Sequence, residues 1–189
     1  MSEIDIVGPM PNSWRPTSRP VIFVDGGQKW RQGADVQALS IGDGDSDPIG
    51  PMDVRLPADK DISDFGFALS QLAESVQKIS LYGFNGGRFD HDLANLGELH
   101  AFLKTRHAHV QIEGRGHAVS AGAWTFQIQG LFSVLMLEAN PVTIQGDCKY
   151  KLERHTLTPL SSHGLSNEGF GEIRIESTGP VFVFTGLKD

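Results

Sequence analysis

Apolar residues follow two different patterns along the chain, and the change between them divides the sequence. Between Val21 and Gly114, short apolar runs alternate with segments in which apolar residues recur at helical spacing. After Gly114 only short strand-like runs follow, separated by glycine and proline. The pattern predicts an open, mostly parallel α/β sheet in residues 1–113, followed by a small all-β sandwich domain in residues 114–189.

Four strands and two helices are predicted in the first part. The strands are short runs rich in β-branched residues, at Val21–Val24, Ala38–Ile41, Ile79–Tyr82 and His109–Ile112. The helices are expected at Ile62–Val76 and from Asp90 to about Arg106. Asp61 and Asp64, three residues apart, resemble a capping pair at the start of the first helix.

The second part is predicted to contain five strands and no helix. They are expected at Trp124–Ile128, Phe132–Leu137, Val142–Ile144, Ile173–Ile175 and Val181–Phe184. Two of these runs, Phe132–Leu137 and Val181–Phe184, offer more apolar surface than one thin sheet can bury, so a homodimer is expected.

Composition indicates an ordinary globular protein. The chain has 189 residues with 39% hydrophobic and 21% charged residues, and no apolar run approaches the length of a membrane helix. The start, Met1–Asp5, lacks the basic and apolar regions of a signal peptide, and the single cysteine, Cys148, has no disulfide partner. We therefore expect a soluble, cytoplasmic protein that does not enter membranes. The net charge of −7 disfavours binding to nucleic acid and to acidic membrane surfaces.

Aspartate is concentrated in the first part of the chain. Between Asp25 and Asp92 there are eleven aspartates and one glutamate, Glu74. Turns account for some of them, but aspartate is a poor helix former, and the clustering exceeds what turns require. Short carboxylates held near turns are suitable ligands for Mg²⁺.

Three predicted strands end in clusters of aspartate and glycine. These clusters are Asp25-Gly26-Gly27, Gly42-Asp43-Gly44-Asp45-Ser46 and Gly86-Gly87-Arg88-Phe89-Asp90-His91. Because ligands bind at the carboxyl ends of the strands in open parallel sheets, the clusters are expected to converge there. Asp43 and Asp45 form an Asp-x-Asp pair that can hold a divalent ion. An EF-hand calcium loop is excluded, since Pro48 stands where glycine is required and Val54 where glutamate is required.

Two basic residues accompany these carboxylates. Lys60 precedes Asp61, Ser63 and Asp64 at a predicted helix start, where a phosphate would be attracted. Asp61 taken alone is better explained as a helix cap. Arg88 is suited to bidentate phosphate contact, or alternatively to a surface ion pair with Asp90.

Taken together, the motifs resemble those of the thiamine pyrophosphokinase family. The resemblance rests on Asp25-Gly26-Gly27, Gly42-Asp43-x-Asp45-Ser46, Lys60-Asp61-x-Ser63-Asp64 and the run from Gly86 to Asn95. In the second part it rests on Gly146, Tyr150-x-Leu152 and Ser166-Asn167. It covers nearly the whole chain from Val21 onward.

The resemblance implies transfer of a diphosphate from ATP to thiamine, with release of AMP. It further implies an α/β domain followed by a β-sandwich, in a homodimer with the thiamine site between subunits. The residues that it assigns to Mg²⁺ are Asp43, Asp45 and Asp64, and the catalytic set adds Arg88 and Asp90. Those that it assigns to the nucleotide are Asp25, Gly26, Gly27, Lys60, Asp61 and Ser63, and those for thiamine are Tyr150, Ser166 and Asn167.

The sequence departs from the family pattern at a few places. The stretch before Asp25 is short and proline-rich, where the family usually has a strand and a helix. Tyr150 stands where tryptophan is frequent, and Gly164 where serine is. Three alternatives stay open: a pyrophosphokinase of related fold that acts on a pterin, a nucleotide-sugar transferase that uses Asp43 and Asp45, and a non-catalytic regulator that binds thiamine or a nucleotide.

Overall fold

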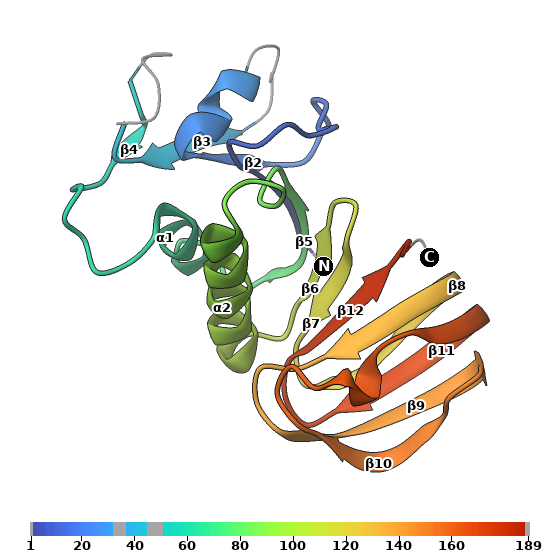
Figure 1. Cartoon of the computed structure of the whole chain (residues 1–189). Coiled ribbons are helices and arrows are strands. Elements are labelled where there is room, and N and C mark those ends of the chain that lie inside the picture. The colour runs from blue at the N-terminus through green and yellow to red at the C-terminus, as the bar shows by residue number, and fades with distance from the viewer. Residues whose placement is uncertain (1, 32–36, 45–50, 188–189) are drawn as a thin grey trace. The chain divides into compact units, whose positions relative to one another are not determined.

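The computed structural model describes residues 2–31, 37–44 and 51–187. Asp45, which the resemblance assigns to Mg²⁺, and Ser46 of the same motif lie outside the described residues. The chain divides into two compact units, Met1–Phe102 and Leu103–Asp189 (Figure 1). Strands predominate, and helices are few. Within the described residues, no helix has the length and apolar character needed to cross a membrane.

The first unit contains a sheet whose strands all pair in parallel. Its order is β4-β3-β2-β1-β5, with β1 between β2 and β5. The strands are β1 (Ser2–Val7), β2 (Val21–Val24), β3 (Ala38–Gly42), β4 (Val54–Arg55) and β5 (Val76–Tyr82). The predicted strands at Val21, Ala38 and Ile79 are confirmed, and the last of them begins three residues earlier.

The central strand, β1, was not predicted from the sequence. A buried parallel strand is expected to be uniformly apolar. β1 does not fit that pattern, because its apolar run is interrupted by Asp5, whose side chain is fully buried. The family's usual strand in this stretch is therefore present at residues 2–7, although the stretch is proline-rich. Three side chains that bind the carboxylate of Asp5 make this buried charge tolerable.

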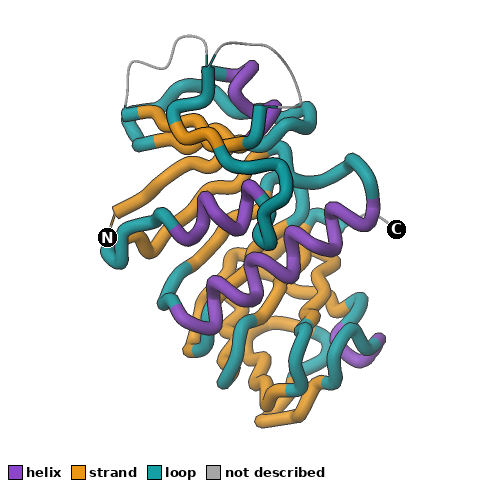
Figure 2. The backbone as a smooth tube through the Cα atoms, turned by 90° about the vertical axis from the view of Figure 1, so that its left-hand side faces the viewer, coloured by secondary structure: helices purple, strands orange, loops and turns teal. Residues whose placement is uncertain are grey.

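The helices of the first unit are α1 (Asp64–Ser70) and α2 (Phe89–Thr105). Both lie on the side of this sheet that faces the viewer in Figure 2. The prediction for α2 is confirmed, but α1 is shorter than predicted, because β5 begins at Val76. The capping residue is Ser63 rather than Asp61, since the Ser63 side chain accepts a hydrogen bond from Gly66 N at 2.9 Å.

The second unit is an antiparallel sheet of seven strands in the order β6-β7-β12-β8-β11-β9-β10. The strands are β6 (His109–Ile112), β7 (Gly116–Val119), β8 (Gly122–Leu135), β9 (Asn140–Cys148), β10 (Leu152–Leu157), β11 (Asn167–Ser177) and β12 (Val181–Thr185). All five strand-like runs lie largely or wholly in these strands. The predicted strand at His109–Ile112 is confirmed as β6, which pairs antiparallel with β7.

The second unit has a single core. Val119 in β7 and Leu157 in β10, near opposite ends of the strand order, belong to the same buried cluster. The sheet must therefore curve so that its ends share one interior. Phe132 and Phe182, which were expected to leave apolar surface exposed, are both buried.

Candidate nucleotide and metal site

Three aspartates of the first unit converge at the carboxyl ends of its strands. Asp25 follows β2, Asp43 follows β3, and Asp64 begins α1. One carboxylate oxygen from each lies within 4.8 Å of the others. All three side chains are partly buried. Such a set of hard oxygen donors, crowded at one point, fits the ligand preference of Mg²⁺.

Lys60 partly neutralises this acidic group. Its Nζ atom lies 3.1 Å from Asp64 Oδ1 and 3.4 Å from Asp43 Oδ2. It also donates a hydrogen bond to the carbonyl oxygen of Pro57. Burial opposes the charged form, but the bonds to Asp64 and Asp43 raise the pKa of Lys60 above its ordinary value. Lys60 therefore stays charged beside the carboxylates.

The pKa of the Asp64 carboxyl group reflects both its burial and its acidic neighbours. Burial raises the pKa of Asp64, and the neighbouring Asp43 and Asp25 raise it further, whereas Lys60 acts in the opposite direction. One lysine thus does not fully compensate three carboxylates. A divalent cation would supply the missing positive charge, so the residues present fit a magnesium ion.

A cavity of about 390 Å³ adjoins this group. Its polar wall includes Asp25, Lys60, Ser63 and Asp64, and its apolar wall includes Pro9, Met10, Val24, Phe65 and Phe84. The rim is completed by Gly83, Gly87, Arg88, His91, Asp92 and Asn95. The size and the mixed lining suit a small ligand with an apolar portion and a charged portion.

Some residues that were predicted to bind the nucleotide do not line this cavity. Asp61 is exposed, and neither it nor Gly26 nor Gly27 lines this cavity. Gly27 has a packing role, because a Cβ atom there would lie 2.2 Å from the carbonyl oxygen of Val7. Ser63 does line the cavity, but its hydroxyl caps α1 and donates to Glu98 Oε1 at 2.8 Å.

Arg88 and Asp90 form a surface ion pair, which was one of the two interpretations of Arg88 from the sequence. Arg88 Nε lies 3.1 Å from Asp90 Oδ1, and both side chains are well exposed. The pairing raises the pKa of Arg88 and lowers that of Asp90. Arg88 still lines the cavity, whereas Asp90 does not.

Asp25 belongs to the acidic group, although the sequence assigned it to the nucleotide and not to the metal. Its backbone has a φ of 51°, in the left-handed region that non-glycine residues rarely adopt. Strain of this kind is often found at functional sites. One feature of the sequence could have indicated that Asp25 belongs to this group, namely its position directly after a predicted buried strand and before two glycines.

The residues predicted for thiamine lie together in the second unit. Tyr150, Ser166 and Asn167 line a cavity of about 670 Å³, with Lys149 and Lys151 beside them. The buried Asn167 side chain holds the Tyr150 backbone: its Oδ1 accepts from Tyr150 N at 2.9 Å, and its Nδ2 donates to Tyr150 O at 2.7 Å. The Tyr150 ring is half exposed, and Lys149 Nζ lies 5.4 Å from its centroid.

No protein-family model matches this sequence, and no curated protein matches it significantly. Solved structures do match it over nearly its whole length. Thiamine pyrophosphokinase from Bacillus subtilis is 22% identical, with 97% of this chain and 99% of that chain covered and a TM-score of 0.78. The enzyme from Geobacillus thermodenitrificans is 21% identical, with 99% of each chain covered and a TM-score of 0.74.

A more distant solved structure extends the similarity. The thiamine pyrophosphokinase from Candida albicans is 11% identical, with 97% of this chain and 88% of that chain covered and a TM-score of 0.69. At these identities the likeness is one of architecture, and it is maintained from one end of the chain to the other. This chain therefore has the fold of the thiamine pyrophosphokinases.

Proposed function

We propose that this chain is a thiamine pyrophosphokinase, which transfers a diphosphate from ATP to thiamine and releases AMP. The observation that carries the proposal is the convergence of Asp25, Asp43 and Asp64 beside Lys60, at the edge of a ligand-sized cavity. The fold shared with enzymes of that name supports it. A protein that only bound thiamine would have no need of three crowded carboxylates.

In the proposed reaction, Asp25, Asp43 and Asp64 hold Mg²⁺, with Asp45 as a further ligand expected from the sequence. When bound there, the ion would supply positive charge that neutralises the phosphates. Lys60 and Arg88 add positive charge beside the phosphates. We expect the apolar wall of the cavity to receive the nucleoside portion of ATP.

The acceptor is the hydroxyethyl oxygen of thiamine. It forms a bond to the β-phosphorus of ATP, and the bond from that phosphorus to the α,β-bridging oxygen breaks. AMP leaves with that oxygen, and the proton of the alcohol is released. The contribution of the chain is mainly to position the two substrates and to stabilise charge.

Thiamine is proposed to bind in the cavity of the second unit, against the ring of Tyr150. Thiamine carries a fixed positive charge, which an aromatic face attracts by roughly 0.5–2 kcal/mol. Asn167 serves this site by fixing the backbone of Tyr150 from both sides. The functional division is that residues 1–113 bind ATP and magnesium and residues 114–189 bind thiamine.

The test is a measurement of AMP release from ATP in the presence of thiamine and Mg²⁺. Asp43→Asn, Asp64→Asn and Asp25→Asn should each reduce the rate by on the order of a hundredfold, because each removes a hard ligand while changing little volume. Asp59→Asn, an exposed aspartate beside Lys60, is the matched control and should retain activity. Full activity in the three variants, or with excess chelator, would disprove the metal assignment.

A further inference from the structure

The segment that joins β1 to β2, residues 8–20, is attached to the sheet at both ends. At its start, Gly8 N donates to Tyr82 O at 2.7 Å, and Met10 N donates to Gly83 O at 3.1 Å. At its end, Pro20 O accepts from Asp5 N at 3.0 Å. Although it is irregular and rich in proline, this segment is therefore built against β1 and β5.

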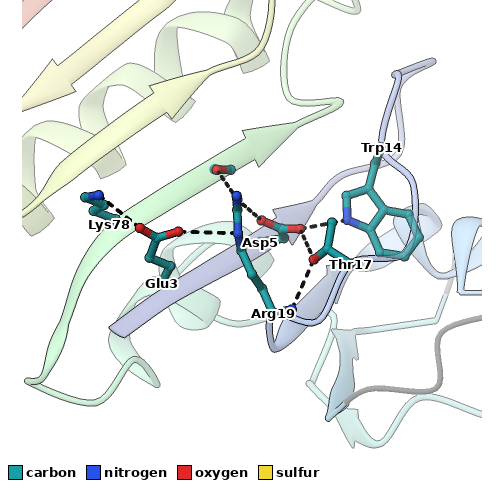
Figure 3. Close-up of polar contacts among 7 residues, drawn as sticks. Glu3, Asp5, Trp14, Thr17, Arg19 and Lys78 are labelled. Atoms are coloured by element: carbon teal, nitrogen blue, oxygen red, sulfur yellow. Dashed lines mark hydrogen bonds and ion pairs between the residues drawn. The ribbon is translucent and has the colours of Figure 1, made fainter. Parts of the chain in front are cut away.

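Asp5 fixes the middle of the same segment. Its carboxylate is fully buried and accepts hydrogen bonds from Trp14 Nε1 at 3.1 Å, Thr17 Oγ1 at 3.3 Å and Arg19 Nη1 at 3.2 Å (Figure 3). All three donors belong to residues 8–20. A buried carboxylate is costly without such partners, so Asp5 strongly favours this one arrangement of the segment.

Two of these partners extend the attachment to other strands. Arg19 also donates to Ser80 Oγ in β5 at 3.2 Å and lies 3.4 Å from Glu3 Oε2 in β1. Trp14 is buried, with its ring edge-on to Phe23 of β2 at 5.2 Å between centroids. The segment is thus held by β1, β2 and β5.

This attachment determines where Met10 lies. The Met10 carbonyl accepts a hydrogen bond from Asn12 Nδ2 at 2.9 Å, and Asn12 Oδ1 accepts from Trp14 N at 3.0 Å. The Met10 sulfur lies against Gly87, where an added Cβ atom would be only 2.5 Å away. A chain of contacts therefore runs from Asp5 through Trp14 and Asn12 to Met10.

Met10 and Pro9 line the cavity beside the acidic group, together with Phe84. A thioether is polarisable and adapts well to the face or edge of an aromatic ring. In a bound nucleotide, the phosphates would lie against Lys60 and the proposed metal. The base would then lie against the apolar wall of the cavity.

We propose that residues 8–20 are a preformed wall of the nucleotide site, in which Met10 contacts the nucleobase and Asp5 is the positioning residue that holds the wall in place. This rests on the proposed function only in that the ligand is a nucleotide. It does not depend on the identity of the acceptor.

The first test measures the binding of ATP, adenosine and inorganic tripolyphosphate by calorimetry in the presence of Mg²⁺. Met10→Ala should weaken ATP and adenosine by a similar factor, about threefold to tenfold, because apolar contact with the base is lost. Tripolyphosphate should bind as it does to the parent protein. Met10→Leu, which restores most of the volume, should bind all three within about twofold of the parent.

The second test addresses Asp5 with Asp5→Asn and the milder Arg19→Gln. Both should shift the indole N–H signal of Trp14 in ¹H–¹⁵N spectra and weaken adenosine binding by about threefold or more, with tripolyphosphate unaffected. Arg19→Lys should partly restore adenosine binding. Arg174→Gln, a matched change at an exposed arginine paired with Glu176 in the second unit, should alter neither measurement.

The outcomes separate this proposal from the proposed function. If the parent binds ATP and Met10→Ala binds adenosine as well as the parent does, the wall proposal is wrong while the function stands. Equal loss of tripolyphosphate and adenosine also overturns it, because a general loss of folding would cause that. If the parent binds ATP with the expected Met10 dependence but forms no thiamine diphosphate, the proposal holds and the function fails. If the parent binds no nucleotide, both fail.

Discussion

Asp53 and Asp64 belong to the same aspartate-rich stretch, but their surroundings move the pKa values of their carboxyl groups in opposite directions. At Asp53 burial acts to raise the pKa, yet hydrogen bonds from Ser40 N at 2.8 Å, from Ser40 Oγ at 2.9 Å and from Arg31 outweigh it, so the pKa is lowered. At Asp64 burial and the neighbouring carboxylates raise the pKa. Asp53 is stabilised by donors already present, whereas Asp64 would gain from an added cation.

This contrast predicts different consequences for stability. Asp53→Asn should lower the free energy of unfolding at neutral pH by about 1 kcal/mol, a value reduced for its partial exposure. Asp64→Asn should lower it by less, because the change relieves carboxylate repulsion. Asp53 has a depressed pKa in the folded state, so its contribution is present above the unfolded-state pKa of about 4 and is lost as the pH falls below it.

Urea unfolding at pH 7 and at pH 3.5 checks both statements. Calorimetric titration with Mg²⁺ then tests the role in metal binding. Asp64→Asn should abolish Mg²⁺ binding, whereas Asp53→Asn should not. A larger loss of stability in Asp64→Asn than in Asp53→Asn would show that Asp64 is a structural residue.

Tyr150 is the residue on which the proposed acceptor depends most. Tyr150→Ala should weaken thiamine binding by about threefold or more, and Tyr150→Trp should keep or improve it, because indole is the better partner for a cation. ATP binding should hardly change in either variant. Fluorescence or calorimetric titration with thiamine gives the comparison. Parent-like thiamine affinity in both variants would place the vitamin elsewhere.

At the residue scale, two of the three clustered aspartates were predicted to lie together, and their role as metal ligands stays a prediction. Asp43 and Asp64 were assigned to one group by the resemblance to the thiamine pyrophosphokinase family, and their carboxylates do lie together. Asp25 could not be assigned to that group, since its carboxylate position depends on an unusual backbone conformation. Asp61 was predicted to cap α1, whereas Ser63 does so. Both residues are good caps, and the sequence alone does not show which side chain accepts the capping hydrogen bond.

At the scale of elements, α1 is short and depends on its N-terminal cap. Seven residues make few intrahelical hydrogen bonds, so the bond from Gly66 N to Ser63 Oγ is a large share of the local stabilisation. Ser63→Ala should lower the free energy of unfolding by about 1 kcal/mol, and Ser63→Thr by less. Ser70→Ala, at the exposed end of the same helix, is the control for urea unfolding. Equal effects of Ser63→Ala and Ser70→Ala would contradict the capping role.

β1 shows why some elements could not be predicted. A strand with a charged residue at its centre does not match the apolar pattern of a buried parallel strand. The partners that compensate Asp5 lie 9 to 14 residues later in the chain, in a segment without periodicity. Only the tertiary structure brings them together. The runs without such a conflict, including β2, β5 and α2, were predicted with small errors at their ends.

At the scale of the whole molecule, the homodimer stays a prediction, but its original reason does not hold. Phe132 and Phe182 are both buried. The large apolar side chains that are exposed among the described residues of the second unit are Tyr150, Leu160, Leu165, Phe170 and Leu187. Light scattering at micromolar concentration should give the mass of a dimer, and replacing Leu160 and Phe170 with serine should favour the monomer. A parent protein that is monomeric and active would contradict a site shared between subunits.

The proposed function is that of a pyrophosphokinase, and the type of group transferred is the feature that sets such an enzyme apart from an ordinary kinase. The most direct measurement is therefore ³¹P NMR of the reaction of ATP with thiamine and Mg²⁺. The account predicts thiamine diphosphate and AMP in equal amounts, with no ADP formed. Formation of ADP, or no reaction with thiamine while a pterin alcohol is converted to its diphosphate, would contradict it.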